Sequence, residues 1–103
     1  MIKVSMLYPN EPDKNFNIPY YYNNHIPLLK KLLGTSCITI AVEQGLNGKI
    51  PDSKVHYILM GHFYFRSEND FNSSFSPNAS SIMNDVTNFT DSRPIIQISE
   101  VKI

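Results

Sequence analysis

The sequence lacks the cysteines, charge excess and long apolar runs that are typical of several large classes of protein. Its 103 residues contain one cysteine, Cys37, so no disulfide can form within the chain and a reducing compartment is the expected setting. The formal net charge is +0 with no basic stripe, so neither nucleic acid nor an anionic membrane is expected as a partner. No apolar run approaches the ~20 residues of a membrane span, and the N-terminus lacks signal-peptide features. We expect a cytoplasmic protein.

Motifs for several kinds of chemistry are also missing. The sequence has no glycine-rich phosphate loop, nucleophile elbow or serine triad. Its three histidines stand without a convergent set of carboxylates or thiols, so no metal site is expected, and no cofactor is expected either. Cys37 has no histidine or cation next to it in sequence and should be an inert thiol. A chain of this length is predicted to form one domain over residues 1–103.

What the sequence does contain is a regular succession of strand and helix patterns. Strands are predicted over residues 2–8, 36–44, 55–65 and 95–103, where apolar and β-branched side chains alternate or dominate. A helix is predicted over residues 16–33, and a second begins at a capping box on Ser67, is interrupted at Pro77 and resumes to residue 84. This order predicts an α+β fold, the ferredoxin-like βαββαβ arrangement with both helices on one face of an antiparallel sheet.

The strand over residues 55–65, VHYILMGHFYF, has no polar face. In an antiparallel sheet this means that both faces are covered, yet the helices of one chain can cover only one of them. A second copy packed sheet to sheet is the simplest cover for the other face. We therefore predict a two-fold homodimer, a dimeric α/β barrel.

The helix over residues 16–33 carries the main functional candidate, His25. On a helical wheel His25 lies in the apolar arc with Tyr21 and Tyr22, while Tyr20 and Pro27 lie on the polar side. An imidazole there could act as a general acid or base, and the two tyrosines could donate to a developing oxyanion. The alternative is a core histidine satisfied by a carbonyl or a tyrosine hydroxyl. Pro27 is expected to bend this helix, which Asn17 caps and Gly34 ends.

Residues for binding a substrate are expected on the strand that follows. Gly61 leaves room for something to approach, and His62 comes directly after it. Leu29 and Tyr64 complete the predicted substrate-binding set. Alternation along the strand does not decide whether His62 faces the helices or the dimer interface, and His56 is expected at an edge or on the surface.

Several segments together resemble a known family. They are residues 4–10, Phe16 with Tyr20-Tyr21, His25 with Pro27-Leu28, the strand MGHFYF at residues 60–65, and residues 94–101, with further likeness at Pro77, Ile82-Met83 and residues 88–90. Over almost its whole length the chain resembles the EthD-like proteins, named for ethyl tert-butyl ether degradation, of the dimeric α/β-barrel superfamily. One departure is Asn17, where the family pattern tends to show Asp.

The resemblance implies a fold more clearly than a reaction. Related barrels include cofactor-independent monooxygenases, lactone isomerases and haem-degrading enzymes. Three hypotheses follow for a protein with a possible small hydrophobic ligand. The first is a cofactor-independent oxidoreductase, monooxygenase or isomerase-type enzyme that acts on a small hydrophobic or aromatic molecule in a cleft beside His25, between the first helix and the sheet. The second is a non-catalytic dimer that binds an apolar metabolite or supports a degradation pathway. The third is a barrel that binds haem through His25.

Overall fold

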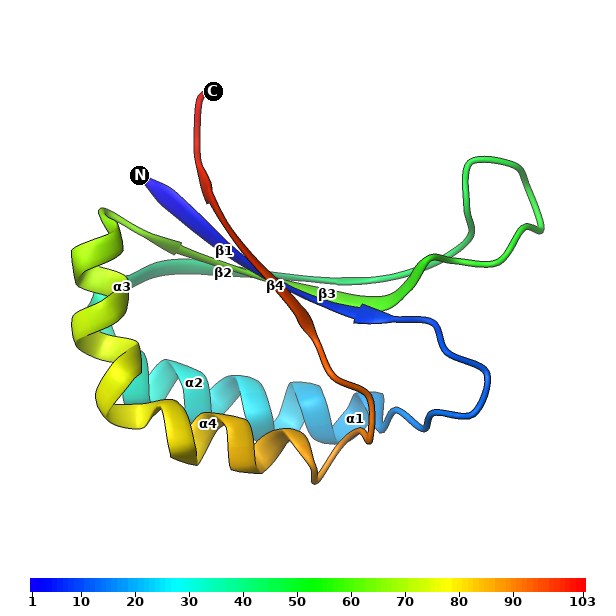
Figure 1. Cartoon of the computed structure of the whole chain (residues 1–103), viewed down its shortest axis with the longest axis horizontal. Coiled ribbons are helices and arrows are strands. Elements are labelled where there is room, and N and C mark those ends of the chain that lie inside the picture. The colour runs from blue at the N-terminus through cyan, green and yellow to red at the C-terminus, as the bar shows by residue number, and fades with distance from the viewer.

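All four strands join one sheet in the order β2-β3-β1-β4, and every neighbouring pair is antiparallel. The computed structural model describes all residues, 1–103. The strands are β1 (Ile2–Pro9), β2 (Cys37–Gln44), β3 (Tyr57–Phe65) and β4 (Ile95–Glu100). Residues 45–56, between β2 and β3, form an irregular loop that extends away from the sheet (Figure 1). The predicted βαββαβ arrangement is confirmed.

All the helices lie on one face of this sheet (Figure 1). The first helical segment consists of α1 (Ile18–Tyr20), the π-helical turn η1 (Tyr21–His25) and α2 (Ile26–Leu33), followed by the short 3-10 turn η2 (Gly34–Ser36). The second consists of α3 (Glu68–Phe75), η3 (Ser76–Asn78) and α4 (Ala79–Val86). The predicted caps are in place: the side chains of Asn17 and Ser67 accept from the amides of Tyr20 and Asp70.

The π-helical turn η1 accommodates Pro27 in the first helical segment. Pro27 has no amide hydrogen and would leave the carbonyl of Asn23 unpaired in a regular α-helix. Instead the helix widens, and the amide of Ile26 donates to the carbonyl of Tyr21, five residues back. The extra residue rotates the preceding turn relative to α2. Tyr22, predicted to face the core, is therefore 40% exposed, whereas Tyr20, predicted to face outwards, is half-buried.

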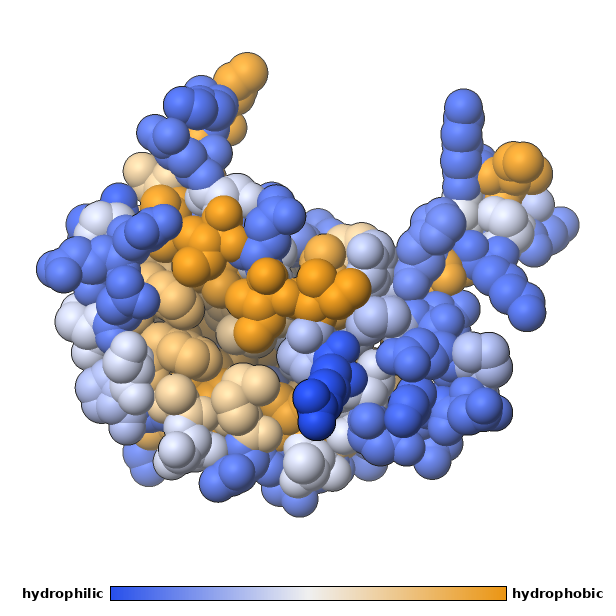
Figure 2. All heavy atoms as spheres, viewed as in Figure 1, coloured by the Kyte–Doolittle hydropathy of each residue, from blue (hydrophilic) through white to orange (hydrophobic).

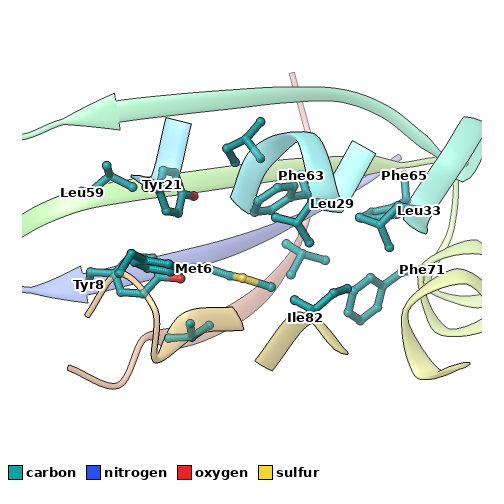
Figure 3. Close-up of a cluster of buried hydrophobic side chains, with 14 of the residues drawn as sticks. Met6, Tyr8, Tyr21, Leu29, Leu33, Leu59, Phe63, Phe65, Phe71 and Ile82 are labelled. Atoms are coloured by element: carbon teal, nitrogen blue, oxygen red, sulfur yellow. The ribbon is translucent and has the colours of Figure 1, made fainter. Parts of the chain in front are cut away.

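The hydrophobic core fills the space between the sheet and the helices (Figure 3). Alternate residues of the two central strands supply one side of it: Val4, Met6 and Tyr8 from β1, and Leu59, Phe63 and Phe65 from β3. The helical layer supplies the other side, with Tyr21, Leu29, Leu33, Phe71, Ile82, Val86 and Phe89. This packing holds the helical layer in a fixed position over the centre of the sheet.

No helix covers the opposite face of the sheet (Figure 1). The register places Leu7 of β1 opposite Met60 of β3 and Ile95 of β4, so three apolar side chains lie in one row on that face. The next row contains His62 and Ser5. We refer to this surface, with Ser5, Leu7, Met60, His62 and Tyr64 at its centre, as the open face. The chain has no helix with the length and apolar character needed to cross a bilayer.

Candidate functional site

His25 is hydrogen-bonded to a carboxylate from the other helical segment. Its Nδ1 atom lies 2.8 Å from Oδ2 of Asp85, which comes from α4. The two residues are 60 positions apart in sequence and meet because η1 and α4 pack side by side on the sheet. A charged carboxylate can only accept hydrogen bonds, so Nδ1 carries the proton and Nε2 carries the lone pair. This arrangement presents Nε2 as the basic atom.

Asp85 is itself held in place by two further donors. The Tyr20 hydroxyl donates to Oδ1 at 2.7 Å, and the Asn88 side-chain amide donates to the same oxygen at 2.9 Å. Asn88 also donates to the Tyr20 oxygen at 3.3 Å, which closes the network. With both oxygens occupied, the carboxylate has little freedom to rotate, and the orientation of the His25 ring is fixed with it.

The charge states follow from burial and from these bonds. Burial lowers the pKa of His25 below its ordinary value, and this effect outweighs the opposing influence of Asp85. Burial would raise the pKa of Asp85, but the hydrogen bonds from Tyr20, Asn88 and His25 outweigh it and lower the pKa. The hydrogen bond that Tyr20 donates to Asp85 raises the pKa of Tyr20, and burial adds a smaller contribution. The resting pair is a neutral imidazole beside a charged carboxylate.

The second ring nitrogen of His25 has no partner. Nε2 is buried without a hydrogen bond, and so is the hydroxyl of Tyr8 on β1. Both residues border one aromatic cluster: the Phe89 ring centroid lies 4.7 Å from that of His25 and 5.7 Å from that of Tyr8. Two unpaired polar atoms in one apolar region are costly, because each has lost water without gaining a substitute. A catalytic role is one explanation for such atoms, and an ordered water is another.

The cleft predicted beside His25 is absent from the single chain, because packed aromatic side chains fill the space around the ring. The residue has 0% of its surface exposed, and none of the four pockets of the chain is lined by His25, Tyr21 or Tyr22. Its ring contacts Tyr21 and Phe89, with centroids 5.5 and 4.7 Å away. A haem bound through Nε2 would have to displace these aromatic rings, so the geometry does not favour the haem hypothesis.

The predicted site residues fall into two groups separated by the sheet. On the helix side, Tyr21 and Leu29 are buried with His25, and the hydroxyl of Tyr21 lies over Gly61, where a Cβ atom would come within 2.5 Å of it. Gly61 therefore does leave room for a close approach, by a side chain of the same molecule. His62 and Tyr64 lie on the open face, so one cleft of a single chain cannot contain the whole predicted set.

On the open face, His62 is bonded to both of its neighbours. Its Nδ1 lies 2.8 Å from the Ser5 hydroxyl, and its Nε2 lies 3.2 Å from the carboxylate of Glu43 on β2. His62 and Ser5 are buried, whereas Glu43 is exposed. These residues link three adjacent strands. His56, by contrast, is exposed near the start of β3, as predicted.

The most important residue that the sequence analysis missed is Asp85. It lies in a polar stretch of α4 with no motif around it, and only the packing of η1 against α4 brings it to His25. Tyr20 was missed because the π-helical turn changed its direction. No three His, Cys, Asp or Glu side chains come together in a way that could hold a metal ion.

Comparison with known proteins assigns this fold to a family. The family model described as EthD domain matches residues 14–93. An EthD-like protein from Ralstonia eutropha JMP134 is 33% identical, with a TM-score of 0.94 over 99% of this chain and 92% of that chain. An ethyl tert-butyl ether degradation (EthD) family protein from Bacillus halodurans C-125 is 17% identical, with a TM-score of 0.70 over 99% of each chain.

A more distant likeness extends to an antibiotic biosynthesis monooxygenase, which is 10% identical with a TM-score of 0.52 over 100% of both chains and is therefore similar in fold alone. No curated protein matches the sequence significantly. The match over residues 14–93 covers the helix with His25, the strand with Gly61 and His62, and the segment with Asp85. The chain belongs to the EthD domain family.

Proposed function

We propose that this protein is a cofactor-independent enzyme in which His25 removes a proton from a small hydrophobic or aromatic substrate. The observation that carries this proposal is the 2.8 Å contact of His25 Nδ1 with Asp85, together with a buried Nε2 atom that has no partner. An imidazole that is oriented by a carboxylate and free on its other nitrogen is the general-base unit of many active sites. Asp85 would stabilise the imidazolium once Nε2 has accepted the proton.

The surroundings of Nε2 suit a substrate that is acidified by a neighbouring carbonyl or aromatic ring. Burial keeps the imidazole neutral at pH 7 and strengthens any hydrogen bond made to the developing anion. The Tyr8 hydroxyl, which has no partner, belongs to a residue of the same aromatic cluster and is a candidate donor for that anion. Proton removal is the first step both of an isomerisation, which returns the proton to another atom, and of a cofactor-independent oxygenation, in which the deprotonated substrate gives its electrons to dioxygen.

The second candidate is a binding protein without catalysis. The complete burial of His25 and the absence of a pocket beside it favour this alternative. Catalysis requires that the aromatic cluster opens, with movement of Phe89 away from the His25 ring. In both cases the proposed protein is a cytoplasmic homodimer, which the single cysteine and the uncovered open face support.

The test compares substitution of two histidines. His25→Gln keeps much of the volume and some hydrogen bonding but cannot act as a base at neutral pH; His56→Gln is the matched control, because His56 is exposed. The probe is 2-tetralone, a hydrophobic carbon acid, and the measurement is proton–deuterium exchange at carbon in D2O by NMR. General-base catalysis predicts exchange by the wild type and by His56→Gln, and a fall of about 100-fold or more in His25→Gln.

The folded fraction of each variant is measured by circular dichroism before the exchange rates are compared. A wild-type rate equal to that of folded His25→Gln would contradict the proposal. If His25→Gln instead loses stability while its folded fraction exchanges as fast as the wild type, His25 is a core residue and the non-catalytic alternative is favoured.

A further inference from the structure

A cavity lies on the other side of α4 from His25. It has a volume of about 410 Å³ and is formed by the end of α4 and by the segment of residues 87–94 that leads into β4. Cavities of roughly 300–1,000 Å³ are the usual size for small-molecule sites in proteins. Its lining includes Val86 and Thr90, which are the direct sequence neighbours of Asp85 and Phe89. In sequence, each of these two lining residues is therefore adjacent to a residue that contacts His25.

The lining of this cavity combines apolar side chains with a cation, Arg93, that has no acidic partner. Met83 and Val86 supply the apolar wall, and Arg93 lies among the lining residues with an exposed side chain. Arg93 takes no part in the three contacts between basic and acidic side chains, which are His25–Asp85, His62–Glu43 and Lys102–Glu100. A planar guanidinium with unused donors is well suited to a carboxylate, which it binds through two parallel hydrogen bonds.

The other polar side chains of the lining already have partners. Asp91, the one acidic residue of the lining, accepts from the backbone amide of Asn15 at 2.9 Å. The Thr90 hydroxyl donates to the Asn15 carbonyl and accepts from the Ser92 amide, and the Ser92 hydroxyl donates to Glu11. Arg93 is thus the group in the lining with the most unused hydrogen-bonding capacity.

An exposed apolar surface continues from the cavity along β4. Ile96 and Ile98 pair with Met6 and Val4 of β1, so their side chains lie on the helix side of the sheet. They are nevertheless 46% and 43% exposed, because no helix covers this edge strand. Figure 2 shows hydrophobic side chains gathered over β4 and over the hollow between β4 and α4. This surface could accommodate the apolar part of a ligand whose polar end is held in the cavity.

From this combination we infer that the cavity binds the carboxylate of an amphipathic apolar acid through Arg93, with the hydrocarbon part against Met83 and the isoleucines of β4. This site lies on the other side of α4 from His25, so the inference goes beyond the proposed function and does not rest on it. The binding itself does not need His25 to be catalytic, so it is measured separately from turnover.

The test uses three probes that share a chain and differ in their head group: dodecanoate, dodecanol and dodecylamine, each below its micelle concentration, with binding measured by isothermal titration calorimetry. The variant is Arg93→Gln, and Arg66→Gln is the matched control because Arg66 is the only other arginine and is also exposed. We expect dodecanoate to bind at least about tenfold more tightly than dodecanol, and Arg93→Gln to lose that advantage. Arg66→Gln should bind dodecanoate as the wild type does.

Three results would overturn the inference: equal affinity for the acid and the alcohol, tighter binding of the amine, which would point to Asp91, or unchanged dodecanoate binding by Arg93→Gln. Absence of binding by every probe would overturn it as well. His25→Gln separates the two proposals. If it binds dodecanoate normally but exchanges 2-tetralone as fast as the wild type, the proposed function fails and the carboxylate site stands. If His25→Gln instead loses exchange while Arg93→Gln binds dodecanoate as the wild type does, the carboxylate site fails and the proposed function stands.

Discussion

His25 and Asp85 form a pair whose properties come from their contacts rather than from either residue alone. The carboxylate fixes which ring nitrogen carries the proton, and the donors Tyr20 and Asn88 fix the carboxylate. In Asp85→Asn the ring would lose the acceptor that orients it and that would stabilise its protonated form. We expect this variant to keep the fold and to lose most of any proton transfer at Nε2, which the deuterium exchange of 2-tetralone would detect.

The pair also predicts how stability depends on pH. The pKa of His25 is lowered in the folded state, so between its ordinary value of 6.5 and the lowered value the unfolded chain binds more protons than the folded one. Stability should therefore fall as the pH drops below about 6.5. Asp85, whose pKa is also lowered, adds a further loss as the pH falls through its ordinary value of 3.8.

This dependence is measured from the melting temperature at pH 7.5, 6.5 and 5.5 at constant ionic strength. His25→Gln should show a flatter profile over this range, and His56→Gln should keep the wild-type slope. An NMR titration of His25 in the wild-type protein checks the cause directly. A titration midpoint at or above 6.5 would contradict a lowered pKa of His25, and with it the predicted fall in stability at lower pH.

At the scale of elements, the close contact between the first helical segment and β3 depends on Gly61. A Cβ atom at this position would lie 2.5 Å from the Tyr21 hydroxyl and 3.1 Å from the Phe63 ring, closer than packed atoms tolerate. Gly61→Ala should therefore lower the free energy of unfolding by about 1–3 kcal/mol, as overpacking of a core does. Tyr21→Phe removes the oxygen of the closest contact, so the double variant should regain part of that loss.

A double-mutant cycle by urea denaturation measures this coupling. Tyr22→Phe combined with Gly61→Ala is the control, since Tyr22 is partly exposed and its hydroxyl is not among the three nearest atoms to the new Cβ. Additive effects of Gly61→Ala and Tyr21→Phe would mean that the helix moves away from the sheet as a unit, and the proposed contact would then not be the source of the destabilisation.

At the scale of the whole molecule, the open face is the feature that one chain leaves unexplained. Leu7, Met60 and Ile95 form an apolar row there beside the buried Ser5–His62 pair. We expect a homodimer at micromolar concentration, because burying this row in a sheet-to-sheet contact removes apolar surface from water at ~25 cal/mol per Å². Met60→Glu should give a folded monomer, since two-fold symmetry would bring like charges into an apolar contact.

Light scattering after size exclusion measures both masses. Lys31→Glu also introduces a carboxylate, but on the exposed side of α2, and should remain a dimer. A wild-type protein with the mass of a monomer would remove the basis for a sheet-to-sheet dimer, and a dimeric Met60→Glu would place the interface elsewhere.

Local signals along the chain are enough to predict the order of strands and helices. The alternation of β1, the apolar run of β3, the caps at Asn17 and Ser67 and the stop at Gly34 are local signals, and each is read by the few residues around it. The burial of His25 and Tyr21 followed from helical spacing in the same way. These features were predictable because they depend on periodicity and on backbone chemistry within one element.

The composition of the candidate site depends on packing between elements that are distant in sequence. Asp85 reaches His25 across 60 positions only because two helical segments pack together, and the π-helical turn before Pro27 exchanged the roles of Tyr20 and Tyr22. The sheet then separated Gly61 from His62, which are neighbours in sequence but lie on opposite faces. Contacts between distant elements depend on how whole surfaces fit, and local periodicity carries no information about which polar residues that fit will bring together.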